Sequence, residues 1–161
     1  MTRKFCPFCG KANRKLPGQP HRHCAACGET DWINPAPAIG IALVRDGNVL
    51  LSKRARAPKK GQWDLVGGFI DAGETPAQAA HREVLEETGC RLVEVRIERA
   101  EPGEYGGRPT LNFLAVGRIT GEPRAGDDSA ELRWVPLRRV PPIAWPHEAG
   151  LVRRLAGDMA K

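Results

Sequence analysis

The chain has 161 residues, of which 41% are hydrophobic and 27% charged, with a formal net charge of +6. This composition is typical of a folded globular protein and excludes a disordered one. The longest apolar stretch, residues 38–44, is far too short to cross a bilayer, so we expect no membrane partner. The first residues run into cysteines without an apolar segment, so we expect no secretory signal and a cytoplasmic protein.

Much of the excess positive charge lies in the first sixty residues. A basic surface of this kind attracts a phosphate-rich small molecule or a nucleic acid. A solvated surface with no partner explains the same charge. Charge alone therefore does not choose among these alternatives.

Two C-x-x-C-Gly turns contain four of the five cysteines, which are Cys6, Cys9, Cys24 and Cys27. Two thiolates three residues apart can chelate one ion, and the following glycine lets the backbone turn around it. Two such turns predict a structural Zn²⁺ site with four sulfur ligands. Disulfides would need an oxidising compartment, and a redox site would need only one such pair. His21 and His23 are alternative ligands, but a position on the connecting loop explains them better.

A segment of about 35 residues cannot bury enough apolar surface to fold alone, so metal binding would supply its stability. This segment resembles a zinc ribbon, a module that binds nucleic acid in some proteins and is purely structural in others. The two prolines within Asn34-Pro35-Ala36-Pro37 predict a stiff joint. We therefore expect a zinc ribbon over residues 1–34 and a second domain over residues 37–161.

The second domain opens with two predicted strands, residues 38–45 and 48–53, around an Asp46-Gly47 turn. A short strand is expected over residues 63–66. Thr75, Pro76 and Gln78 have the form of a helix start, with a capping threonine, proline at the first position and glutamine three residues after the cap. This helix should end near Thr88, before Gly89.

The remaining predicted strands are 91–98, 110–119 and 131–135, and a last helix is predicted over residues 147–156. Strands with one or two helices between them indicate an α/β domain with a mixed sheet. The predicted helix after Thr75 carries three glutamates, Glu83, Glu86 and Glu87, on one face of a single turn. A solvated acidic face is the ordinary explanation, but clustered carboxylates in a basic protein also suit hard divalent cations.

The sequence around this helix fits the pattern G-x5-E-x7-R-E-U-x-E-E-x-G-U, in which U is an apolar residue. The matching residues are Gly68, Glu74, Arg82, Glu83, Val84, Glu86, Glu87, Gly89 and Cys90. In this pattern the chain resembles the Nudix hydrolases, over roughly residues 37–155. The resemblance implies an α/β/α sandwich with a mixed sheet, preceded here by the zinc ribbon.

The resemblance also implies roles for residues of this motif. Ligands to Mg²⁺ or Mn²⁺ would be Glu83, Glu86, Glu87 and the carbonyl group of Gly67. Arg82 would pair with Glu74 and hold Glu83 in place. The general base would be Glu86 or Glu83, or else an acid on a downstream loop, for which the candidates are Asp127, Asp128 and Glu131. The implied reaction is hydrolysis at phosphorus, with divalent cations neutralising the diphosphate and activating water.

A ribbon placed before such a domain resembles the NADH-pyrophosphatase-like group and related ADP-ribose or FAD pyrophosphatases. The downstream array that marks the NADH enzymes is replaced here by residues 101–107, and a proline expected in ADP-ribose enzymes is missing too. We expect hydrolysis of ADP-ribose, FAD or a similar dinucleotide, with Arg54, Arg56 and Tyr105 as substrate-binding candidates. The alternative is hydrolysis at an RNA 5′ end, with nucleic acid as a less favoured partner. The resemblance also implies a homodimer.

Overall fold

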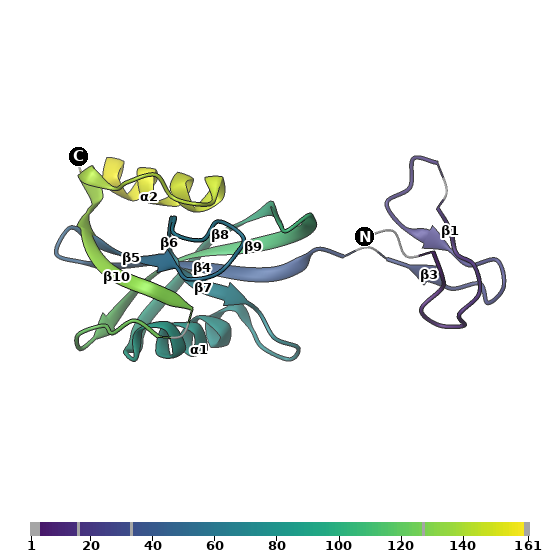
Figure 1. Cartoon of the computed structure of the whole chain (residues 1–161), viewed down its shortest axis with the longest axis horizontal. Helices are drawn as coiled ribbons and strands as arrows, with labels where there is room; N and C mark the ends of the chain where they lie inside the picture. Colours follow the sequence, from purple (N-terminus) through teal and green to yellow (C-terminus); the bar gives the residue numbers. More distant parts are fainter. Residues whose placement is uncertain (1–3, 16, 33, 127, 160–161) are drawn as a thin grey trace.

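The structure is a computed structural model that describes residues 4–15, 17–32, 34–126 and 128–159. Near the N-terminus, three short antiparallel strands form a small sheet in the order β1-β2-β3. They are β1 (Arg14–Lys15), β2 (Arg22–His23) and β3 (Thr30–Asp31). Figure 1 shows this small sheet outside the main body of the chain, joined to it by the segment that enters β4.

The main sheet has seven strands, which are β4 (Ala36–Arg45), β5 (Asn48–Arg54), β6 (Trp63–Asp64), β7 (Val66–Phe69), β8 (Arg91–Tyr105), β9 (Arg108–Thr120) and β10 (Ser129–Pro136). Five of them follow the order β10-β5-β4-β9-β8, while β6 pairs with β5 and β7 pairs with β4. The β4 and β9 strands are parallel and the other pairs antiparallel, so the predicted mixed sheet is confirmed.

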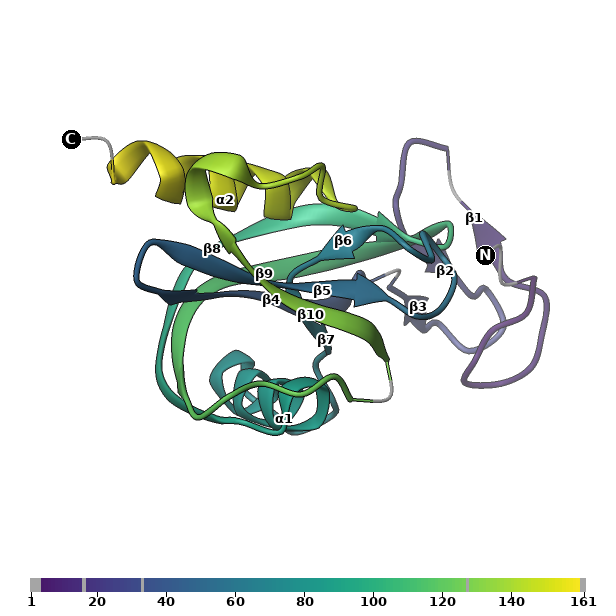
Figure 2. The same ribbon diagram turned by 60° about the vertical axis from the view of Figure 1, so that its left-hand side comes forward.

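Helix α1 (Pro76–Thr88) and helix α2 (Pro146–Asp158) cover opposite faces of this sheet (Figure 2). A short 3-10 helix, Leu137–Arg139, leads from β10 toward α2. The layers form the α/β/α sandwich that the resemblance implied. Among the described residues, neither helix is long and apolar enough to cross a membrane.

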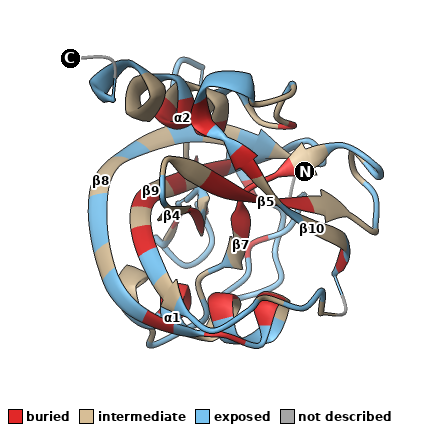
Figure 3. Cartoon of the chain, turned by 90° about the vertical axis from the view of Figure 1, so that its left-hand side faces the viewer, coloured by how far each residue is buried: buried red, intermediate tan, exposed pale blue. Residues whose placement is uncertain are grey.

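Two apolar cores separate the three layers (Figure 3). Side chains alternate between the faces of a strand, so neighbouring residues of β5 enter different cores. Leu50 packs with Val84 on the α1 side, and Leu51 packs with Leu151 on the α2 side. This alternation explains why both helices are held firmly, each through one apolar stripe.

Helix α1 begins and ends where its sequence predicts. Thr75 caps the first turn: its hydroxyl accepts from the Gln78 backbone N–H at 3.3 Å, and its own N–H donates to the Gln78 side chain at 2.8 Å. At the other end, Gly89 adopts a left-handed φ of 67° that favours glycine. These two ends fix which helix residues face the sheet.

Strand β8 is longer than the sequence indicates, because it continues to Tyr105 instead of ending at residue 98. Its second half pairs with β9 across a Gly106-Gly107 turn whose φ angles are 57° and 78°. Glycine at both positions suits the tight turn that joins two antiparallel strands. Pro102 and Gly103 disfavour a strand, so the sequence of this half does not predict one. Its pairing with β9 explains why it is extended. Tyr105 therefore lies on the sheet, not in the expected loop.

Candidate active site

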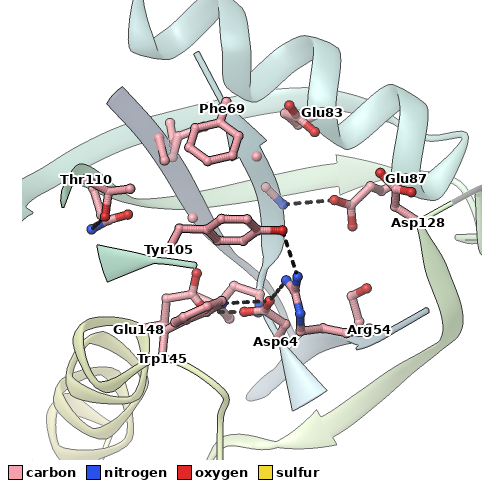
Figure 4. A pocket seen from close by; sticks show the side chains of 18 of the residues that line it. Arg54, Asp64, Phe69, Glu83, Glu87, Tyr105, Thr110, Asp128, Trp145 and Glu148 are labelled. Atoms are coloured by element: carbon pink, nitrogen blue, oxygen red, sulfur yellow. Dashed lines mark hydrogen bonds and ion pairs between the residues drawn. The ribbon is translucent and has the colours of Figure 1, made fainter. Parts of the chain in front are cut away.

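A pocket of about 420 Å³ opens on the main sheet and is lined by both helices and several strands (Figure 4). Glu83 and Glu87 approach it from α1, and Glu148 approaches it from the first turn of α2. Arg54 at the end of β5 and Tyr105 at the end of β8 lie between them. The pocket therefore has an acidic side at α1 and an aromatic side at α2.

The acidic side is built around two partly buried glutamates. Glu87 accepts from the Gly67 backbone N–H at 3.4 Å and from the Ser129 hydroxyl at 3.2 Å. Burial raises the pKa of Glu87 to about 8, and burial also raises the pKa of Glu83. Gly68 makes room for Glu83, since a Cβ at position 68 would lie 2.7 Å from its carboxyl carbon.

Arg82 joins the helix to the loop that precedes it. Its guanidinium donates to Glu74 at 2.8 and 2.9 Å and to the Phe69 carbonyl at 2.9 Å. It also donates to Glu83 at 2.7 Å and to Glu86 at 3.2 Å. The hydrogen bonds from Arg82 lower the pKa of Glu74 to about 2. This network holds the carboxylate of Glu83 in one orientation at the pocket wall.

Replacing Arg82 by lysine should weaken divalent-metal binding by about 10- to 100-fold, because an ammonium group cannot donate to five oxygen atoms of four residues at once. Metal affinity can be measured by Mn²⁺ titration with an electron paramagnetic resonance readout. Arg118→Lys, at an exposed position on β9, is the matched control. Equal metal affinity in Arg82→Lys and the control would contradict this role.

The acidic side fits a divalent cation on three observations. The donors are hard oxygens, which Mg²⁺ and Mn²⁺ prefer. The described hydrogen-bond donors to Glu87 are neutral groups, so a bound cation would be the partner that its ionised form needs. Position 67 accepts only glycine, because its φ is 154° and a Cβ would collide with the Ile39 carbonyl. Glu83, Glu87 and the Gly67 backbone therefore lie together, as the sequence predicted.

The other predicted site residues differ in whether they line the pocket. Glu86 is exposed, pairs with Arg82 and, among the described residues, is not part of the pocket lining. Asp128 lines the pocket and pairs with Arg56 at 2.9 Å, so this candidate base lies in the same pocket as Glu83 and Glu87. Glu131 pairs with Lys53 and Arg133 outside the pocket lining. The remaining candidate, Asp127, lies outside the described residues.

The aromatic side contains the predicted candidate Tyr105 together with three residues that sequence reasoning missed. Phe69, Tyr105, Trp145 and His147 form a row, with ring centroids 5.2, 5.6 and 6.4 Å apart in that order. Trp145 is partly buried, and its indole N–H donates to Asp64 at 3.0 Å.

Arg54 lies next to this row and is held in place there. It donates to Asp64 at 2.6 Å and to the Tyr105 hydroxyl at 3.4 Å. The useful sequence signal was the run Trp145-Pro146-His147-Glu148, which puts rings and a carboxyl at the start of a helix.

The four predicted zinc ligands come together in the small N-terminal sheet. The sulfur atoms of Cys6 and Cys27 are 3.7 Å apart and those of Cys9 and Cys24 are 3.6 Å apart. All four lie within 4.8 Å of one another, and no histidine joins this group among the described residues. Backbone N–H groups of residues 27 and 26 lower the pKa of Cys24 to about 7, which favours the thiolate. The cluster can hold a metal ion.

The layered fold and the glycine-loop-helix site define an α/β protein of the Nudix class. The sequence pattern of the NUDIX domain matches residues 34–155, so the chain belongs to the Nudix family. The chain is similar to a NUDIX hydrolase from Nitrosomonas europaea, with 29% identity, a TM-score of 0.76 and coverage of 98% of this chain and 93% of that one. It is also similar to a MutT NUDIX hydrolase from Burkholderia pseudomallei, with 30% identity, a TM-score of 0.69 and coverage of 74% and 97%.

Among curated proteins, the chain is similar to the NAD-capped RNA hydrolase NudC of Edwardsiella ictaluri, with 28% identity over 161 residues. That match covers 98% of this chain and 60% of the relative. The chain spans about half to three-fifths of the length of the curated relatives it matches. The predicted Nudix resemblance and enzyme class are confirmed, and the four-cysteine cluster is consistent with a zinc ribbon.

Proposed function

We propose that the chain is a Mg²⁺- or Mn²⁺-dependent hydrolase of the diphosphate bond in a nucleoside-diphosphate-linked compound such as ADP-ribose, FAD or a similar dinucleotide. The observation that carries this proposal is the two-sided pocket, which has carboxylates at one end and aromatic rings at the other. A dinucleotide has the complementary chemistry, with anionic phosphates joined to flat bases. The Zn²⁺ assigned to the cysteine cluster belongs to the same proposal and has a structural role.

Glu83 and Glu87 would hold the divalent cation, with the Gly67 carbonyl beside them. When bound, the cation supplies charge neutralisation at the diphosphate and lowers the pKa of water. Arg82 keeps Glu83 oriented, and the Ser129 hydroxyl keeps Glu87 oriented. Arg56, exposed at the rim, would attract the phosphates.

A carboxylate near the acidic side must accept the proton of the attacking water. The residues proposed for this step are Glu83, Glu86 and Asp128. Asp128 has the advantage that it lines the pocket without binding Arg82. The ion pair between Asp128 and Arg56 is exposed and weak. Arg56 can therefore leave Asp128 and bind a substrate phosphate instead.

Hydrolysis at the 5′ end of RNA is the second candidate, and two observations favour it. The curated relatives of this chain are named NAD-capped RNA hydrolases. The N-terminal segment also exposes three aromatic side chains, Phe5, Phe8 and Trp32, each more than 60% accessible, among basic residues. Exposed rings combined with positive charge suit single-stranded nucleic acid.

The test is a substrate panel assayed with Mg²⁺ and with Mn²⁺. The panel contains ADP-ribose, FAD, NADH, diadenosine polyphosphates, nucleoside triphosphates and an RNA oligonucleotide carrying a 5′ NAD cap. We expect mononucleotide products and a kcat/KM at least about 10-fold higher for dinucleotide-type substrates than for triphosphates. Absence of turnover on every diphosphate-linked compound with both ions would refute the proposal.

Salt dependence separates the two candidates in the same panel. If the N-terminal segment binds RNA, raising the salt concentration from 50 to 200 mM should slow capped-RNA hydrolysis by about 10-fold or more, because phosphate contacts release counterions. Hydrolysis of ADP-ribose should change much less. Equal salt dependence of the two reactions would remove the support for an RNA-binding ribbon.

A further inference from the structure

The chain has two serines, Ser52 and Ser129, and they are hydrogen-bonded to each other next to Glu87. Their hydroxyl oxygens are 2.6 Å apart, and the two residues are only 4% and 6% exposed. Ser52 lies on β5 and lines the pocket, while Ser129 is the first residue of β10. Alanine would pack at either position without taking a polar group out of water, so the buried hydroxyl pair calls for an explanation.

An irregularity in β10 brings the two serines together. The register between β10 and β5 shifts between Ser129 and Glu131, which is the sign of a bulge. A bulge bends the strand and changes the direction of a side chain. Ser129 lies opposite Arg54, two residues from Ser52 on β5 and on the same face of the sheet. The two hydroxyls therefore meet diagonally across the strand pair.

The segment before β10 is attached to the last turn of α1. The Gly126 backbone N–H donates to the Glu87 backbone carbonyl at 2.9 Å, and the Ser129 N–H donates to the Gly126 carbonyl at 3.1 Å. Glycine is required for this approach, because a Cβ at position 126 would collide with the Glu86 carbonyl oxygen. These contacts hold the Ser129 hydroxyl 3.2 Å from Oε2 of the Glu87 side chain.

The direction of the hydrogen bonds follows from the number of protons. A carboxylate that binds a cation can only accept, so Ser129 must donate its one hydroxyl proton to Glu87. The contact between the two serines must then use the proton of Ser52, with Ser129 as the acceptor. Hydrogen bonds that run in one direction strengthen one another. Without Ser52, the Ser129 hydroxyl would be free to rotate away from Glu87.

We propose that Ser52 is a positioning residue for the divalent cation, and that it acts through Ser129 to hold Oε2 of Glu87. The other carboxylate oxygen, Oε1, accepts from the Gly67 N–H at 3.4 Å, so each oxygen is held from a different strand. Two such donors fix the plane of the carboxylate before a metal ion binds. The inference rests on the proposed function, because it requires Glu87 to bind a divalent cation.

The test is a double-mutant cycle of Ser52→Ala, Ser129→Ala and the double variant, with Mn²⁺ affinity measured by electron paramagnetic resonance. We expect Ser129→Ala to weaken Mn²⁺ binding by about 10-fold and Ser52→Ala by about 3- to 10-fold. The double variant should bind Mn²⁺ no more weakly than Ser129→Ala, because Ser52 then has nothing to act through. Thr120→Ala, which removes an exposed hydroxyl at the end of β9, should match the wild type.

Unchanged Mn²⁺ affinity in Ser52→Ala would overturn the inference. Additive losses would also overturn it, because Ser52 would then act on the cation or its water directly. Should Ser129→Ala fail to fold, the cycle is run with Ser129→Cys, whose thiol is a weak donor, and the same pattern is expected.

The inference and the proposed function fail in different ways. Mn²⁺ binding with the expected non-additive pattern but without hydrolysis contradicts only the proposed function. Hydrolysis with additive or unchanged affinities contradicts only this inference. A wild-type protein that binds no Mn²⁺ would refute both.

Discussion

Glu87→Gln is expected to lower turnover by at least about 100-fold on every substrate the protein hydrolyses, without loss of the fold. Glu87 is a partly buried side chain at the acidic side of the pocket, and glutamine keeps its shape but cannot become the carboxylate that a cation needs. Burial raises the pKa of Glu87 to about 8, so without metal its carboxyl is mostly neutral near pH 7, and glutamine should leave the melting temperature close to that of the wild type. The stabilisation that Mg²⁺ or Mn²⁺ adds to the wild type should fall in the variant.

Turnover and thermal melting are measured side by side for this variant and for Glu94→Gln. Glu94 lies exposed on β8, so its substitution removes the same charge away from the pocket. Wild-type turnover in Glu87→Gln would exclude the proposed metal site. A variant that melts far below wild type would instead assign Glu87 a structural role.

Cys24→Ser is expected to release the ribbon metal and unfold residues 4–32 while the main sheet stays folded. The small sheet has three two-residue strands, which cannot hold together without a metal ion. Hydrogen exchange should show loss of amide protection in this segment and unchanged protection in β4 and β9. Metal content, measured by mass spectrometry, should fall from one zinc per chain to near zero.

Cys90→Ala provides the matched control, since Cys90 is the one cysteine outside the cluster and is buried just after the end of α1. It should keep its zinc and its ribbon protection. If residues 4–32 remain protected in a Cys24→Ser protein shown to be free of zinc, the ribbon does not depend on metal.

The parts of the fold with local signals were predictable. Helix α1 carries its own cap in Thr75 and its own stop in Gly89, and both are confirmed. Strands β4 and β5 have apolar runs that a buried sheet requires. The second half of β8 has no such signal, because its strand form depends on hydrogen bonds to β9, far along the chain. Non-local pairing of this kind cannot be deduced from local propensity.

The site residues also divide into those that a local sequence motif predicts and those that only the packing of the fold brings together. Glu83, Glu87 and Arg82 belong to one motif, so their spacing alone predicted that they would lie together. Asp64 and Glu148 are 84 positions apart, and only the packing of α2 against the sheet makes them neighbours. Asp64 falls within the predicted strand 63–66 and Glu148 within the predicted last helix, and neither was a predicted site residue.

Because α1 and α2 lie on opposite faces of the sheet, the two sides of the pocket receive their residues from different layers. Substitutions in the first turn of α2 should change the aromatic side of the pocket without moving the glutamates of α1. Substitutions in α1 should likewise leave the aromatic side unchanged. Natural selection can therefore change the preferred substrate while the residues proposed for hydrolysis stay the same. Family members that keep the acidic helix but differ at positions 145–148 should accordingly form separate groups by preferred substrate.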